Sequence, residues 1–114
     1  MYNNIVERNT DFVYLKTFVW DTEKNEINKK KHHISFELAV RVFNDPYLIK
    51  QYDNVNSTLE EERWKCTGKD LQSGTFRTLT VSITERGERK RIFSARKSNQ
   101  REIKDYEKNA AAFL

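Results

Sequence analysis

The sequence predicts an α+β fold in which helices cover one face of a mostly antiparallel sheet. Two observations lead to this prediction. Three stretches have the pattern of helices, each behind a capping residue, and the segments between the second and the third alternate apolar and polar side chains as strands do. The chain has 114 residues, the length of one domain, so we expect residues 1–114 to form a single unit.

The N-terminal part of the sequence predicts an arm or an added strand, followed by a strand and a helix. Residues 1–10 are polar and aperiodic, so they form either a flexible arm or an added strand. Residues 12–20 are rich in aromatic and β-branched side chains, which favours a strand. Asp21 then has the side chain of a helix N-cap and Glu23 lies in the first turn, so a helix should run from there to about His32.

A second helix is predicted behind Ser35, another N-cap side chain, and should stop at residues 44–46 because Pro46 cannot continue it. Its apolar stripe consists of Phe36, Ala39, Val40 and Phe43. Strands should follow at 47–52, 62–67 and 75–84, separated by a polar loop and a turn. In the last of these, Leu79, Val81 and Ile83 point to one face, which leaves the other face polar.

The segment from Arg86 to Arg101 contains all of the positive excess of the chain. Seven basic side chains against one acid give it a charge of +6, whereas the whole chain carries +4. We expect a strand here because apolar residues interrupt the charges. Alternation would place Ile92, Ser94 and Arg96 on one face and Arg91, Phe93 and Ala95 on the other. Such a folded basic surface is typical of a site that meets an anion.

The last stretch predicts a helix capped by Ser98 or Asn99. Its apolar stripe consists of Ile103, Tyr106, Ala110 and Phe113. Because Tyr106 lies on this stripe, we expect it in the core rather than in a catalytic site.

Several classes of protein are excluded or disfavoured by composition. The single cysteine, Cys66, excludes an internal disulfide and suits a reducing cytoplasm. No apolar run reaches the length of a membrane span, and no secretory leader opens the chain. His32 and His33 are adjacent and point apart on a helix, so we expect no metal site and no cofactor. A pI near 9.2 favours acidic partners, nucleic acid among them.

The candidate site residues each have a plainer interpretation. The arginines of the basic segment either hold phosphate or pair with nearby glutamates on a solvated surface. Glu62 could accept a proton beside Arg63, or the two could be an ordinary ion pair on an edge strand. His32 could be a general acid or base, or it could simply end its helix.

Five ordered blocks of the sequence match a known pattern. They are W-D-x-x-K-x-x-x-N-x-x-K-H from Trp20, I-S-F-E-x-A-x-x-V-F-x-D-P from Ile34, E-E-R-W from Glu61, T-x-R-G-x-x-x-R-I-x-S-A-R from Thr84, and a glutamate and a tyrosine at Glu102 and Tyr106. This pattern resembles the BrnT family of bacterial toxin–antitoxin modules. Two departures are His33, where the family usually has glycine, and Phe93, where it usually has an aliphatic residue.

The resemblance implies a RelE-like fold and a ribonuclease toxin that needs no metal and inhibits translation and growth. It also implies a cognate antitoxin that carries a DNA-binding region. Operator DNA would be bound only through the toxin–antitoxin complex, in which a homodimer is one option. Histidine tolerates left-handed backbone better than most residues, so we expect His33 to cost little.

On this resemblance we predict roles for nine residues. Glu62 would be the base, and Arg63, Arg91 and Arg96 would surround the phosphate. The RNA itself would be held by Lys31, His32, Arg86, Arg89 and Arg101. The alternative is a catalytically silent module that binds nucleic acid or an antitoxin. The two differ in whether the purified protein shortens RNA in the presence of a chelator.

Overall fold

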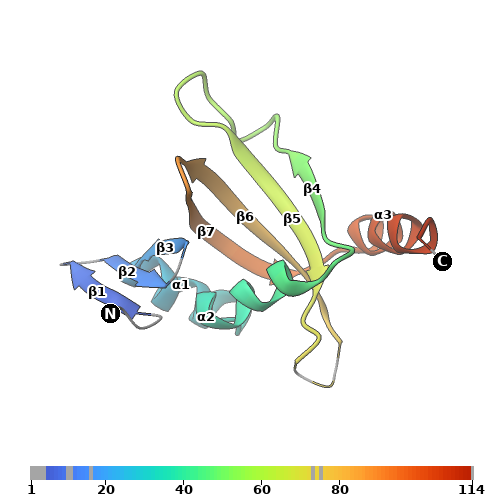
Figure 1. The fold of residues 1–114 in the computed structure, drawn as a ribbon, viewed down its shortest axis with the longest axis horizontal. Helices are drawn as coiled ribbons and strands as arrows, with labels where there is room; N and C mark the ends of the chain where they lie inside the picture. Colours follow the sequence, from blue (N-terminus) through green and yellow to red (C-terminus); the bar gives the residue numbers. More distant parts are fainter. Residues whose placement is uncertain (1–4, 10–11, 16, 73, 75, 114) are drawn as a thin grey trace.

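The computed structural model describes residues 5–9, 12–15, 17–72, 74 and 76–113 (Figure 1). It contains one seven-stranded sheet with the strand order β1-β2-β3-β7-β6-β5-β4. The strands are β1 (Ile5–Asn9), β2 (Phe12–Leu15), β3 (Phe18–Asp21), β4 (Ile49–Tyr52), β5 (Arg63–Lys69), β6 (Thr78–Arg86) and β7 (Arg89–Lys97). All neighbours are antiparallel except β3 and β7. The α+β class and the mostly antiparallel sheet are therefore confirmed.

The N-terminal segment differs from the simplest prediction. Of the two alternatives for residues 1–10, the structure has the added strand over Ile5–Asn9, where β1 pairs with β2. The single strand predicted at 12–20 is instead two antiparallel strands, β2 and β3. A tight reversal within one β-rich stretch is hard to see in sequence, because no glycine or proline marks it.

The helices begin where their caps predict. Helix α1 (Thr22–His32) is capped by Asp21, whose carboxylate accepts hydrogen bonds from the amides of Glu23 and Lys24 at 2.8 and 3.4 Å. It ends at His33, which adopts the left-handed conformation with φ 60° and donates its amide to Lys29. His33 thus ends α1 in the left-handed conformation that glycine most often supplies.

The second predicted helix is divided. Ser35 caps α2 (Phe36–Ala39), and the chain then tightens into a 3-10 helix, η1 (Val40–Asn44). The tighter turn buries Val42 in place of Val40 and Phe43, which are only partly buried. The fully buried side chains of this segment pack against the apolar face of the sheet, where Gly68 of β5 lets Val42 approach its backbone.

Leu79, Val81 and Ile83 of β6 lie on this apolar face and are fully buried, as predicted. The last helix, α3 (Gln100–Ala111), lies at the far end of the sheet from α1 and α2 (Figure 1). Its first turn contacts the polar face through a hydrogen bond between Glu102 and Thr80. The polar face is therefore closed by α3 at one end and open along the rest of β5, β6 and β7.

Strand β7 does not alternate regularly, so the predicted faces are wrong. Ser94 pairs with Ser82 but Ile92 pairs with Ile83, which makes Phe93 the extra residue of a β-bulge. Beyond the bulge the alternation is reversed. Ile92 and Ala95 share the buried face, whereas Ser94 and Arg96 share the polar face with their partners Ser82 and Thr80.

The edge of β7 that β3 does not pair with forms hydrogen bonds to a side chain of α1. The pairing of β3 with β7 stops after Val19 and Arg91. Further along, the amide of Asn28 donates to the carbonyl of Ala95 at 2.8 Å and accepts from its N–H at 3.1 Å. Asn28 thus makes the two bonds that a neighbouring strand would make, and a third bond, to the Ile34 carbonyl, holds it there.

Candidate nucleic-acid interface and active site

A groove of about 350 Å³ opens on the polar face of the sheet. Residues from α1, the loop after β4, and all three long strands line it: Lys24, Asp53, Asn56, Arg63, Ser82, Phe93 and Ser94. The groove therefore joins segments that lie up to 70 positions apart in the sequence. Three of its residues, Arg63, Ser82 and Ser94, lie where strand alternation sends polar side chains away from the core.

The ring of Phe93 lines this groove and has three cationic side chains near it. The guanidinium carbon of Arg63 lies 4.1 Å from the ring centroid. The ammonium of Lys24 lies 5.4 Å from it, and the guanidinium carbon of Arg91 lies 5.9 Å from it. These are cation–π distances, so the bulge at Phe93 brings together cations from α1, β5 and β7.

Arg63 is held by both its side chain and its backbone. Its guanidinium binds the Glu61 carboxylate at 3.1 Å, and its backbone N–H donates to the Ser57 hydroxyl at 2.8 Å. Hydrogen bonds from Arg86 and Arg63 lower the pKa of Glu61 despite its partial burial. Glu61 is therefore an anion that orients Arg63 in the groove.

Asp53 contributes a buried carboxylate to the same groove. It accepts hydrogen bonds from the backbone amides of Val55 and Asn56 at 3.2 Å, and from the Asn56 side chain at 2.9 Å. Burial alone would raise its pKa, but the Asn56 hydrogen bonds and the charge of Lys65 outweigh burial and lower it. Asp53 is thus ionised at neutral pH.

Arg96 is occupied by a second ion pair on the same face. Its two terminal nitrogens donate to the two oxygens of Glu102 at 2.8 and 2.9 Å. Glu102 is buried, accepts from Thr80 and from the Asn99 amide, and completes the capping box of α3. The pair raises the pKa of Arg96, and it lowers the pKa of Glu102 although burial opposes this. Arg96 therefore ties β7 to α3.

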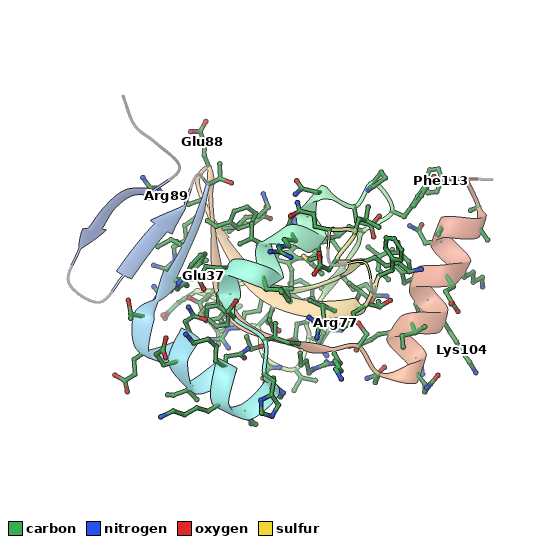
Figure 2. All side chains as sticks on the ribbon, turned by 90° about the horizontal axis from the view of Figure 1, so that it is seen from below. Glu37, Arg77, Glu88, Arg89, Lys104 and Phe113 are labelled. Carbon is green, nitrogen blue, oxygen red and sulfur yellow. The ribbon has the colours of Figure 1, made fainter. Side chains whose placement is uncertain are left out.

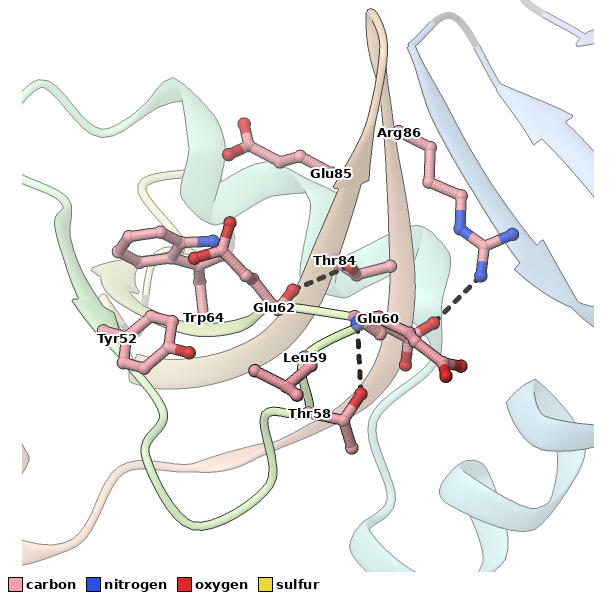
Figure 3. Close-up of a pocket in the computed structure, with 10 residues that line it drawn as sticks. Tyr52, Thr58, Leu59, Glu60, Glu62, Trp64, Thr84, Glu85 and Arg86 are labelled. Atoms are coloured by element: carbon pink, nitrogen blue, oxygen red, sulfur yellow. Dashed lines mark hydrogen bonds and ion pairs between the residues drawn. The ribbon is translucent and has the colours of Figure 1, made fainter.

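Glu62 lies directly before β5, which begins at Arg63. It lines a separate cavity of about 420 Å³, where its side chain points toward Trp64 (Figure 3). Its carbonyl accepts the Thr84 hydroxyl at 2.7 Å. Because Arg63 lines the groove and Glu62 lines this other cavity, the structure does not bring the two side chains together in one site.

The five predicted RNA contacts are scattered around the molecule. Lys31 and His32 end α1. Arg86 and Arg89 face each other at the tip of the β6–β7 hairpin, and Arg86 also binds Glu61 at 2.9 Å (Figure 3). Arg101 lies in the first turn of α3. The ion-pair interpretation thus holds for Arg86 and Arg96, since Arg86 binds Glu61 and Arg96 binds Glu102.

The model of the family described as "Ribonuclease toxin, BrnT, of type II toxin-antitoxin system" matches residues 20–102. The chain belongs to the BrnT family. The matched range begins at Trp20 and ends at Glu102, so it contains every residue of the groove. Comparison with individually curated proteins finds no match.

Membership of the BrnT family makes this chain one of a group of ribonuclease toxins, each of which implies a cognate antitoxin. Within the described residues, no group of three or more His, Cys, Asp or Glu side chains could hold a metal ion. No helix in the described part of the chain is long and apolar enough to cross a membrane.

Two other reactive side chains of this BrnT chain lie in the core. Cys66 is fully buried, and burial raises its pKa to about 12, so the thiol stays protonated. Tyr106 is buried as predicted and donates to Asp45, and burial with this bond raises its pKa. Both are structural residues.

The sequence predicts only Arg63 among the seven residues of the BrnT groove. The other six are Lys24, Asp53, Asn56, Ser82, Phe93 and Ser94. They come together through strand pairing and through the bulge at Phe93, neither of which is visible in the sequence. The one available signal was the departure of Phe93 from the aliphatic residue usual in the family.

Proposed function

We propose that this chain is a toxin that cleaves RNA without a metal ion and does so in the groove around Phe93. The observation that supports the proposal is that three cations lie within 6 Å of the Phe93 ring, in a groove that also contains an ionised carboxylate. RNA carries its own nucleophile, the 2′-hydroxyl, so a protein can cleave it with charge and proton transfer alone.

The proposed reaction is an attack of the ribose 2′-oxygen on the adjacent phosphorus. The 2′-hydroxyl gives its proton to a base as the O2′–P bond forms. The P–O5′ bond then breaks, and the departing 5′-oxygen takes up a proton. The products are a 2′,3′-cyclic phosphate and a free 5′-hydroxyl. The extra negative charge on the crowded phosphate is the feature that cationic side chains stabilise.

We assign the phosphate contacts to Arg63 and Arg91, because both guanidinium groups lie within 6 Å of the Phe93 ring. For the base we propose Asp53, the carboxylate of the groove, in preference to Glu62, which lines a different cavity. For the proton donor we propose Lys24. Arg96, which is bonded to Glu102, is proposed as a positioning residue that holds β7 beside α3.

The remaining cations are proposed as outer contacts to the RNA backbone. These are Lys31, His32, Arg86, Arg89 and Arg101. They lie on four different elements, so they would meet phosphates at different points along the strand, as in nonspecific strand binding. We also propose that the partner is an antitoxin with a DNA-binding region and that the fold is RelE-like, which the α+β class and the order of elements support.

The test is cleavage of a single-stranded RNA by purified protein with and without a chelator. We expect the same rate in both, and a 2′-deoxy substitution at the cleaved nucleotide should abolish cleavage. Loss of activity on chelation would contradict the metal-independent mechanism. Folded wild-type protein that binds RNA but leaves it intact would favour the alternative of a silent binding module.

The choice of base is tested by a matched pair of substitutions. Asp53→Asn should lower the cleavage rate by about 10²-fold or more, whereas Glu62→Gln should leave most of it. Because the pKa of Asp53 is below its ordinary value, the rate should stay flat as pH falls from neutral toward about 4. A fall in rate through pH 6 to 7, or the reverse ranking of the two variants, would show that another group is the base.

A further inference from the structure

In the pairing of β6 with β7, Phe93 is the one described residue of β7 that has no partner in β6. A bulge costs ladder hydrogen bonds and is usually retained because it redirects a side chain. Here the large apolar side chain leaves the buried row of Ile92 and Ala95 and joins the polar face. The ring is only half-buried, so core packing does not account for its place.

Two properties of the surroundings fit one kind of ligand. Arg63 stacks 4.1 Å from the ring and is oriented by Glu61, so the pair presents a fixed aromatic and planar cationic surface. Lys24 and Arg91 add charge at 5.4 and 5.9 Å. Aromatic rings and guanidinium planes stack on unpaired bases, while cations beside them bind the phosphates of the same strand.

The floor of the groove leaves room for such a base. Ser82 and Ser94 are cross-strand partners next to Phe93 and have the small side chains needed there. Neither hydroxyl has a hydrogen-bond partner among the described residues, so both can donate to or accept from a base edge. A volume of about 350 Å³ lies at the small end of ligand sites, which suits one nucleotide and not a duplex.

We propose that Phe93 and Arg63 form a nucleobase subsite that stacks one unpaired base of the RNA and thereby sets where the strand is held. The proposal rests on the proposed function, because it takes RNA as the ligand. It adds a requirement that charge alone does not impose. The substrate must be single-stranded at this point, and a base must be present there.

The experiment measures binding of a short 2′-fluoro RNA, which has no 2′-hydroxyl and cannot be cleaved. It is compared with a series in which one base at a time is removed while the backbone stays intact. Wild-type protein should lose about 5- to 100-fold in affinity at one abasic position, the range expected for one stacked base. Equal affinity for every member of the series would refute the subsite whatever the variants do.

The variants then locate the effect at Phe93. Phe93→Leu should weaken binding of the intact strand by the same factor, and removal of the base should then cost nothing more. Phe93→Tyr keeps the ring and should behave as wild type. The matched control is Phe113→Leu, since Phe113 packs on Tyr47 at the end of α3 and not in the groove (Figure 2). A folded Phe93→Leu protein that retains the full abasic penalty would overturn the proposal.

The outcomes separate the subsite from the ribonuclease assignment. If wild type cleaves unmodified RNA but shows no abasic penalty, the function stands and the subsite is refuted. If the penalty depends on Phe93 but unmodified RNA stays intact, the subsite stands and the ribonuclease assignment fails. If wild type binds no RNA, both are refuted.

Discussion

Arg96→Ala should destabilise the fold far more than the loss of a rim arginine would. The substitution removes two hydrogen bonds, of 2.8 and 2.9 Å, from the carboxylate of Glu102. That carboxylate keeps only Thr80 and the Asn99 amide as partners, at 3.0 and 2.9 Å. In the structure, loss of Arg96 would leave the buried carboxylate of Glu102 without its cationic partner.

The magnitude follows from the exposure of the two side chains. The Arg96 side chain is 32% exposed and that of Glu102 is 11%, so the pair is neither a surface pair nor a fully buried one. Surface pairs contribute about 0–1 kcal/mol, and breaking a fully buried pair costs about 3–5 kcal/mol. We therefore expect Arg96→Ala to lower the free energy of unfolding by about 2 kcal/mol. For a domain of this size that lowers Tm by roughly 6–12 °C.

The assay is thermal and urea unfolding of wild type, Arg96→Ala and Arg96→Lys. Lysine should recover only part of the loss, because it keeps the charge without the two-pronged geometry. The pKa of Glu102 is lowered in the folded state, so its contribution is full above the unfolded pKa and is lost as pH falls through the folded pKa. The difference between wild type and Arg96→Ala should therefore shrink below about pH 4.

Two results would refute this reasoning. One is an Arg96→Ala protein whose Tm lies within about 1 °C of wild type, which would make the pair an ordinary surface contact. The other concerns cleavage. A positioning role predicts that activity returns at low temperature, where the variant is folded. A loss of about 10²-fold in fully folded protein would instead place Arg96 at the phosphate.

Three further predictions concern the edge of β7, the charged surface and the cell. Asn28→Ala should lower the free energy of unfolding, measured by urea titration, by about 2–3 kcal/mol, because it removes the side chain that binds the N–H and C=O of Ala95. The matched change Lys30→Ala, at an exposed position of α1, should lower it little. RNA binding should weaken steeply as the salt concentration rises, because neutralised phosphates release counterions. An affinity that does not change with salt would show that the cations do not contact the RNA phosphates. Expression of the chain alone should slow bacterial growth, and the antitoxin encoded beside it should restore growth; normal growth with abundant folded protein would argue against a toxin.

The sequence alone determined the features that depend on near neighbours in the chain. The limits of α1 follow from Asp21 and from the left-handed residue His33, both of which act within one helical turn. The buried face of β6 follows from strict alternation of Leu79, Val81 and Ile83. The ordered blocks from Trp20 onward also identified the family, because their spacing is itself a property of the sequence.

Tertiary structure decided what depends on pairing between distant segments. The bulge at Phe93 is a matter of register between β6 and β7, and one skipped residue reverses every face after it. Asn28 meets Ala95 across 67 positions, and Arg96 takes a partner from α3 and not from solvent. Composition located the positive charge on this segment. Only the folded sheet decided which of those charges meet at one groove, because strand register, and not sequence distance, sets which side chains are neighbours.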